Sequence, residues 1–330
     1  MSCAVERTED IVIPVTPSSP IVPSAHAKPV QNGRGILLMA FGFFLFSAVD
    51  TQAKFLAQDF HPIQIVWIRQ LGLLVGMFWL LGWHGTSILR TARPGMQVIR
   101  GALAVISATI FIFAVREVPL ADAVAVSFVA PFIVTIFGAL ILREPVGIRR
   151  WVAVAIGFAG TLIIIRPGAG VLHPAILLVV VAAALFSARQ ILSRMLAAQD
   201  RTATTVAYTA LTGSLLLTLA LPFVWAWPTN ATQWLLFVSI AAMAAVAELM
   251  VIKALEIAQA VAVAPMQYTM MIWGTFYGYL VFGQLPDFWT LVGAAVIIAT
   301  GIYVINRERI AAREGHMRMV ASREKPGEPS

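Results

Sequence analysis

Cysteine, charge and buried histidine are scarce in this sequence, and each shortage excludes a class of function. The single cysteine, Cys3, excludes an intramolecular disulfide and argues against a cysteine-based metal site. All five histidines fall in expected tails or loops, so no imidazole base or metal cluster lies inside an apolar segment. A phosphate-binding glycine motif is also missing, because Gly168-Ala169-Gly170 lies in an expected loop. We therefore expect no catalytic residue, no metal and no cofactor.

Charged residues make up only 12% of the chain, whereas hydrophobic residues make up 59%. A soluble domain carries charge on about a quarter of its residues, and about 20 apolar residues cross a bilayer as a helix. The pattern predicts an all-α integral membrane protein with ten transmembrane helices. We place them at about 35–55, 63–83, 96–115, 119–141, 150–166, 174–196, 204–227, 232–255, 260–282 and 287–306.

A short motif occurs twice and divides these segments into two sets. Leu45-Phe46-Ser47-Ala48 returns as Leu185-Phe186-Ser187-Ala188, an offset of 140 residues that other short matches share. A fixed internal period indicates one unit built twice. Five spans per unit is an odd number, so the second unit would enter the membrane in the opposite orientation. We predict two inverted five-helix repeats, at 35–166 and 174–306, an arrangement typical of transporters.

The two ends of the chain are polar, and the basic residues predict their location. Residues 1–34 are rich in proline and are expected to be a disordered tail, and residues 307–330 form a basic tail. With the N-terminus inside, 17 Lys and Arg residues lie on the cytoplasmic side and 3 on the outer side. We expect a multi-pass protein of a bacterial-type cytoplasmic (inner) membrane with both termini cytoplasmic. The net charge of +7 is then a topology signal, and no nucleic-acid partner is expected.

The ends of the fourth and ninth segments carry a family resemblance. Residues 138–145 (GALILREP), followed by Trp151 and Gly160, are similar to the signature of proteins with two EamA domains in the drug/metabolite transporter (DMT) superfamily. The second copy, residues 278–284 (GYLVFGQ), carries Gln284 where the family has Glu, which argues against any role that needs this carboxylate twice. The resemblance covers about 35–306. It implies a permease for small metabolites that are amino-acid-, cofactor- or vitamin-like.

Charged side chains inside the predicted spans are the main site candidates, because each costs roughly 2.5–3.5 kcal/mol at mid-membrane. Asp50 and Arg69 are expected on the outer side of the centre, and Arg189 and Glu248 on the inner side. We hypothesise that Asp50 or Glu248 binds a coupling proton and that Arg69 or Arg189 meets an anionic group of the substrate. Two alternatives stay open: these charges only pair with each other, or Asp50 pairs locally with Lys54 at a spacing of four residues.

Uncharged candidates lie near the same depth. Arg69 shares a helix face with Gly72 and Gly76, a spacing typical of close helix contacts. The further candidates for binding the substrate or an ion are Ser47, Ser187, Gln267, Tyr268 and Trp273. Proline lacks a backbone N–H and can therefore kink a helix. The kink candidates are Pro131 and Pro265. The aromatic members suit stacking on a heterocycle, and plain packing is the alternative.

Together these features predict a secondary active transporter that moves a small organic metabolite by alternating access, driven by an ion or substrate gradient. Its partners would be that metabolite and the lipid bilayer. A passive channel or facilitator is the alternative. A membrane-embedded enzyme is less well supported, because the sequence offers no clustered nucleophile or acid–base pair.

Overall fold

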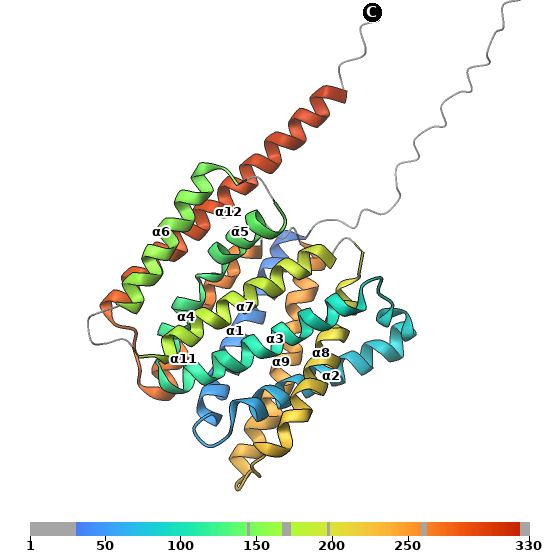
Figure 1. Cartoon of the computed structure of the whole chain (residues 1–330), viewed down its shortest axis with the longest axis vertical. Helices are drawn as coiled ribbons and strands as arrows, with labels where there is room; N and C mark the ends of the chain where they lie inside the picture. Colours follow the sequence, from blue (N-terminus) through green and yellow to red (C-terminus); the bar gives the residue numbers. More distant parts are fainter. Residues whose placement is uncertain (1–30, 144–145, 167–172, 197–198, 259–262, 324–330) are drawn as a thin grey trace, which may run out of the picture.

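The computed structural model describes residues 31–143, 146–166, 173–196, 199–258 and 263–323, and every regular element in these ranges is a helix (Figure 1). The α-helices are α1 (Asn32–Leu56), α2 (Pro62–His84), α3 (Pro94–Glu117), α4 (Leu120–Ser127), α5 (Ala130–Ile141), α6 (Ile148–Ile165), α7 (Ala175–Leu196), α8 (Thr202–Ala220), α9 (Ala231–Ile257), α11 (Thr269–Phe282) and α12 (Phe288–Arg323). Short 3-10 helices are η1 (Gly85–Leu89), η2 (Leu221–Phe223) and η3 (Ala264–Tyr268). Most of the predicted N-terminal tail lies outside the described residues.

Eight helical segments of the described residues are long and apolar enough to cross a membrane, and α2 contributes a shorter apolar stretch, Pro62–Phe78. The helices α4 and α5 count together as one of the eight, Leu120–Ile141. Within the predicted span 260–282, the described residues form η3, which contains Pro265, and then α11. A multi-pass helical membrane protein is thus confirmed, and the count of ten spans stays a prediction.

Helix starts follow from local chemistry. Pro62 is the first residue of α2, where its missing N–H costs nothing. Asn230 caps α9 by accepting a hydrogen bond from the Gln233 N–H at 2.9 Å. The α12 helix begins in the same way, because the Thr290 N–H donates to the Asp287 carboxylate at 2.8 Å. Polar residues at the predicted breaks therefore satisfy backbone donors that the helices leave free.

The fourth span is interrupted, and the described part of the ninth changes from a 3-10 helix to an α-helix. The α4 helix ends at Ser127, α5 begins at Ala130, and Pro131 lies in the first turn of α5. The junction of η3 and α11 falls at Tyr268, which is 140 residues after Phe128. The two rings touch edge to face, with centroids 5.4 Å apart. The interruptions therefore lie next to each other in the core.

The two halves of the chain interleave instead of forming separate bodies. The most extensive helix contacts join α1 to α9, α3 to α7 and α6 to α12, and α2 packs on both α8 and α9. Figure 1 shows α6 beside α12 at one edge of the bundle and α2 near α8 at the other. The α12 helix has 36 residues, about 54 Å at 1.5 Å per residue, and extends past the bundle.

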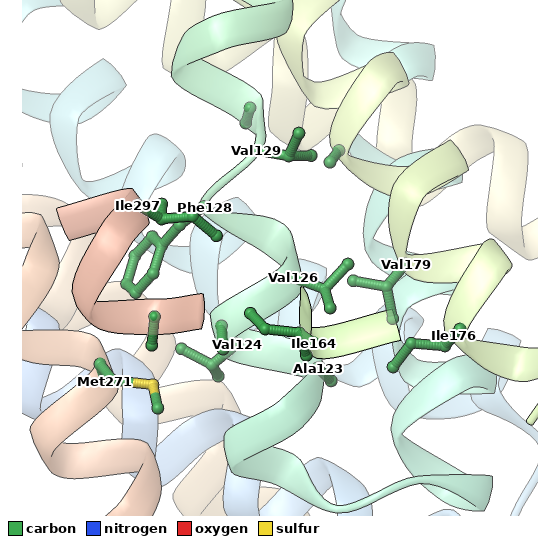
Figure 2. Close-up of a cluster of buried hydrophobic side chains, with 14 of the residues drawn as sticks. Ala123, Val124, Val126, Phe128, Val129, Ile164, Ile176, Val179, Met271 and Ile297 are labelled. Atoms are coloured by element: carbon green, nitrogen blue, oxygen red, sulfur yellow. The ribbon is translucent and has the colours of Figure 1, made fainter. Parts of the chain in front are cut away.

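The largest buried cluster surrounds the interruption at Phe128. It draws on α3, α4, α5, α6, α7, η3, α11 and α12. Figure 2 shows Phe128 beside Ile297, and Val126 close to Val179. Val126, Val129 and Val179 are all fully buried. Packing around the broken span thus joins residues from both halves.

Glycines allow the closest helix approaches. A Cβ on Gly72 of α2 would overlap with the backbone carbonyl of Ala241 in α9. A Cβ on Gly101 of α3 would lie 2.9 Å from the Cβ of Thr212 in α8. Nothing lies within 4 Å of a Cβ on Gly76. The expected close-packing face on α2 is therefore correct at Gly72 and wrong at Gly76, because no neighbouring atom approaches the helix at Gly76.

Candidate functional site

Asp50 and Arg69 form an ion pair between α1 and α2. The Asp50 Oδ1 and Arg69 Nη1 atoms are 3.8 Å apart, and the two side chains are 11% and 23% exposed. The Arg69 guanidinium also lies 5.5 Å from the centroid of the Phe46 ring. At this separation the pair is held by charge attraction without a short hydrogen bond. Two of the four charged candidates are thus in direct contact.

Arg189 lies on α7 and stacks on an aromatic ring in the same manner. Its guanidinium is 4.5 Å from the centroid of Phe186. It interacts electrostatically with Glu248, which attracts it, and with Arg69, which repels it. Phe46 and Phe186 are the matching positions of the duplicated motif. Each copy of the motif therefore places a phenylalanine against an arginine.

Arg100 joins this group, although it is one of the 17 Lys and Arg residues that the sequence analysis counted on the cytoplasmic side. It lies in the second turn of α3, where Nε donates to the Ser193 hydroxyl at 2.7 Å and Nη1 to the Thr209 hydroxyl at 2.5 Å. It also interacts electrostatically with Arg189 and Glu248. The available signal was its position inside the predicted segment 96–115. We call Asp50, Arg69, Arg100, Arg189 and Glu248 the central charge cluster.

The two motif serines differ in their surroundings. Ser187 is fully buried, and its hydroxyl lies 2.7 Å from the Ala183 carbonyl and 3.0 Å from the Ala130 carbonyl. Because it has one proton to donate, these backbone acceptors satisfy it, and it links α7 to α5. Ser47 is buried as well, but its Oγ has no hydrogen-bond partner. The sequence analysis predicted the same role for both serines, whereas only the Ser47 hydroxyl has no hydrogen-bond partner.

The aromatic candidates lie in packing positions. Tyr268 is buried against Phe128, and its hydroxyl occupies the space that a Cβ on Gly301 would need. Trp273 of α11 meets Phe44 of α1 edge to face at 5.0 Å, and its buried Nε1 lacks a partner. Gln267 is half-buried in η3. In the described residues these three make no hydrogen bond or ring contact with the central charge cluster.

Lys54 does not pair with Asp50, which contradicts the local-pair alternative. Its Nζ donates to the Val118 carbonyl at 2.5 Å and to Gln284 Oε1 at 3.0 Å. The Val118 carbonyl follows the end of α3, where backbone acceptors lack helical partners, so a cation is favoured there. Lys54 is only 4% exposed. Gln284, which replaces the Glu of the family signature, thus accepts a hydrogen bond from the other half.

Charged residues also join α6 to α12 at the end of the molecule near Lys54. Arg166, just after α6, forms an ion pair with Asp287, just before α12. Burial raises the pKa of the Asp287 carboxyl, but hydrogen bonds from the Thr290 N–H and hydroxyl and from Arg166 outweigh it and hold the pKa below its usual value. Asp122 of α4 interacts electrostatically with Arg166 and Lys54. Sequence reasoning did not select Lys54, Asp122 or Asp287 as site residues.

We expect Lys54→Met to lower the free energy of unfolding by about 2 kcal/mol. The substitution removes two hydrogen bonds from a charged donor, and it leaves Gln284 Oε1 without that donor. Thermal unfolding of the protein in detergent measures the change. Arg90→Met, at an exposed position, is the control and should leave the midpoint nearly unchanged. Equal midpoints for the two variants would contradict the structural role of Lys54.

Comparisons with known proteins agree with this architecture. The model of the EamA-like transporter family matches twice, at residues 33–166 and 173–307. The chain is 26% identical to an S-adenosylmethionine uptake transporter of Rickettsia conorii, over 84% of this chain and 96% of that protein. It is 31% identical to a riboflavin transporter of Vibrio cholerae, over 85% and 95%, and 25% identical to a pseudopaline exporter of Pseudomonas aeruginosa, over 81% and 94%.

A solved protein structure shares the fold. It aligns with a TM-score of 0.58 and 17% sequence identity, over 84% of this chain and 99% of that chain. The double family match covers most of the described residues, and the relatives are transporters of small metabolites. The chain therefore belongs to the EamA-like transporter family, within the drug/metabolite transporter superfamily.

Proposed function

We propose that this protein is a secondary active transporter that moves a small organic metabolite across the cytoplasmic membrane by alternating access. The observation that carries the proposal is the central charge cluster, because its residues come from both halves of an otherwise apolar bundle. Intramembrane charges are costly and mark substrate or ion pathways. The relatives named for S-adenosylmethionine, riboflavin and pseudopaline support a metabolite-sized substrate.

Alternating access needs two halves that can move against each other, and paired contacts support an inverted repeat of five spans each. The α1–α9 packing has its counterpart in the α7–α3 packing, and α2 and α8 contact each other, as do α6 and α12. The close approach of Gly72 to Ala241 corresponds, at the offset of 140 residues, to that of Thr212 to Gly101. Each contact between the halves is expected to occur twice in this way if a two-fold axis in the membrane plane relates residues 35–166 to 174–306.

The direction in which the protein sits in the membrane follows from its basic residues. We infer cytoplasmic termini from the distribution of 17 Lys and Arg residues against 3. Lys54, Arg116 and Arg166 then lie on the outer side. In this orientation the contacts of Lys54 and Arg166 with the second half would hold the outer side closed.

Proton coupling would use Asp50 or Glu248. Asp50 is already paired with Arg69, so its proton affinity depends on whether that pair stays formed. Glu248 interacts with two arginines, Arg100 and Arg189, and would exchange one of them for a proton or a substrate. Either carboxylate can change its charge as the site changes sides, which is the requirement for coupling.

Counterflow in proteoliposomes tests the proposal. Vesicles loaded with a panel of amino acids, nucleotide-like cofactors and vitamins receive the same labelled compound outside, with and without a pH gradient. We expect one compound class to exchange, and Glu248→Gln to reduce the effect of the gradient at least 10-fold. Glu117→Gln, at an exposed side chain, is the matched control. Flux at channel rates without counterflow, or no flux for any compound, would overturn the proposal.

A further inference from the structure

The central charge cluster is not neutral. It holds three arginines, Arg69, Arg100 and Arg189, and two carboxylates, Asp50 and Glu248. Arginine keeps its proton at neutral pH, so one positive charge stays without a carboxylate inside the cluster. An uncompensated charge within membrane-spanning helices is expensive, and proteins retain it mainly where it serves a ligand or an ion.

The three arginines differ in how their donors are used. Arg69 faces Asp50 at 3.8 Å as an ion pair without a hydrogen bond, and its side chain is 23% exposed. Arg100 is fixed by two hydroxyl acceptors, Ser193 and Thr209. Arg189 has a buried Nε without any hydrogen-bond partner, and its guanidinium carbon lies 4.5 Å from the centroid of the Phe186 ring. A buried donor left unpaired costs about 1–3 kcal/mol, and more when it is charged. Among the three, Arg189 is therefore the arginine that holds a buried and unpaired donor.

The neighbours of Arg189 favour an anion at its free donors. Arg69 and Arg100 both repel it, and only Glu248 attracts it. A negative group at this point would interact favourably with all three arginines. The guanidinium presents planar parallel N–H groups that match the two oxygens of a carboxylate or phosphate.

We infer that the transported substrate carries an oxyanion, a carboxylate or a phosphate group, which binds Arg189, with Arg100 as a second, fixed positive charge. The inference rests on the proposed function and specifies the substrate class of the same site. One monoanionic group brings the central charge cluster to neutrality. Neutral and cationic analogues leave the excess charge in place and should bind more weakly.

Matched ligand pairs test this inference on the full-length protein in detergent. Each oxyanion compound is offered beside its uncharged form: N-acetylated amino acids beside their amides, nicotinate beside nicotinamide, and nucleoside monophosphates beside nucleosides. Thermal stabilisation is the readout. We expect the stabilising compounds to be oxyanions, with at least 10-fold weaker binding of the uncharged partner. Whether the carboxylate or the phosphate members stabilise decides which oxyanion the site takes.

Variants locate the effect. Arg189→Gln should weaken binding of the stabilising oxyanion at least 10-fold, and Arg189→Lys should retain part of the affinity because it keeps the charge and loses the paired donors. Arg100→Gln provides a second test if Arg189→Gln does not fold. Arg90→Gln, at an exposed site, should bind as the wild type does. Unchanged binding in the Arg189 and Arg100 variants, or equal stabilisation by neutral partners, would overturn the inference.

Counterflow separates this inference from the proposed function. If a neutral compound exchanges across the membrane and Arg189→Gln does not affect it, the oxyanion inference falls and the transporter proposal stands. If oxyanions stabilise the wild type through Arg189 but no compound exchanges, the binding inference stands and the transporter proposal falls.

Discussion

Replacing Asp50 with asparagine should lower the free energy of unfolding by about 3 kcal/mol, because it leaves Arg69 without its partner inside the bundle. Arg69→Gln should cost a similar amount. The double variant should recover most of the loss, since it removes both charges at once. Transport driven by a pH gradient should be lost in all three variants if the pair also binds the proton or the substrate.

Unfolding midpoints and proteoliposome uptake together separate a functional pair from a structural one. Arg116 and Glu117 supply the matched control, because their atoms are 3.6 Å apart but their side chains are 43% and 53% exposed. The coupling energy of that exposed pair should not exceed about 1 kcal/mol. Full transport by the stable double variant would show that Asp50 and Arg69 only pair with each other.

The duplicated motif illustrates what could be read from the sequence. Leu-Phe-Ser-Ala recurs at a fixed offset, and the structure places both phenylalanines against arginines. Apolar runs indicated the helices, whereas the cap that Asn230 provides at the start of α9 became visible only in the structure. The motif and the apolar runs depend on the chemistry of neighbouring residues and on the spacing of the repeat, and both can be read from a single sequence.

Partners across the bundle could not be read in the same way. The i,i+4 spacing allowed an Asp50–Lys54 pair, yet Lys54 binds a carbonyl beyond the end of α3 and Gln284 of the other half. Arg100 was counted only as a cytoplasmic-side charge, although its hydrogen-bond partners lie on α7 and α8. Each of these contacts depends on which helices are neighbours. Sequence spacing within one helix contains no information about that.

The same limit applies to the glycines of α2. Gly72 and Gly76 are equivalent by spacing, and only the position of α9 distinguishes them: a Cβ would overlap with the Ala241 carbonyl at Gly72 and meet nothing at Gly76. Glycine in a helix is normally less favourable than alanine by roughly 0.5–1 kcal/mol. Replacing glycine with alanine should therefore change the free energy of unfolding in opposite directions at Gly72 and at Gly76.

We expect Gly72→Ala to lower the free energy of unfolding by about 3 kcal/mol, because the methyl group meets backbone, which cannot rotate away, and α2 and α9 must separate. Gly76→Ala should raise it by about 0.5 kcal/mol through helix propensity alone. Thermal unfolding in detergent and counterflow measure both variants. Since α2 and α9 carry Arg69 and Glu248, the separation should also slow transport. Equal effects at the two glycines would mean that α2 and α9 do not pack as closely as the Gly72 contact requires.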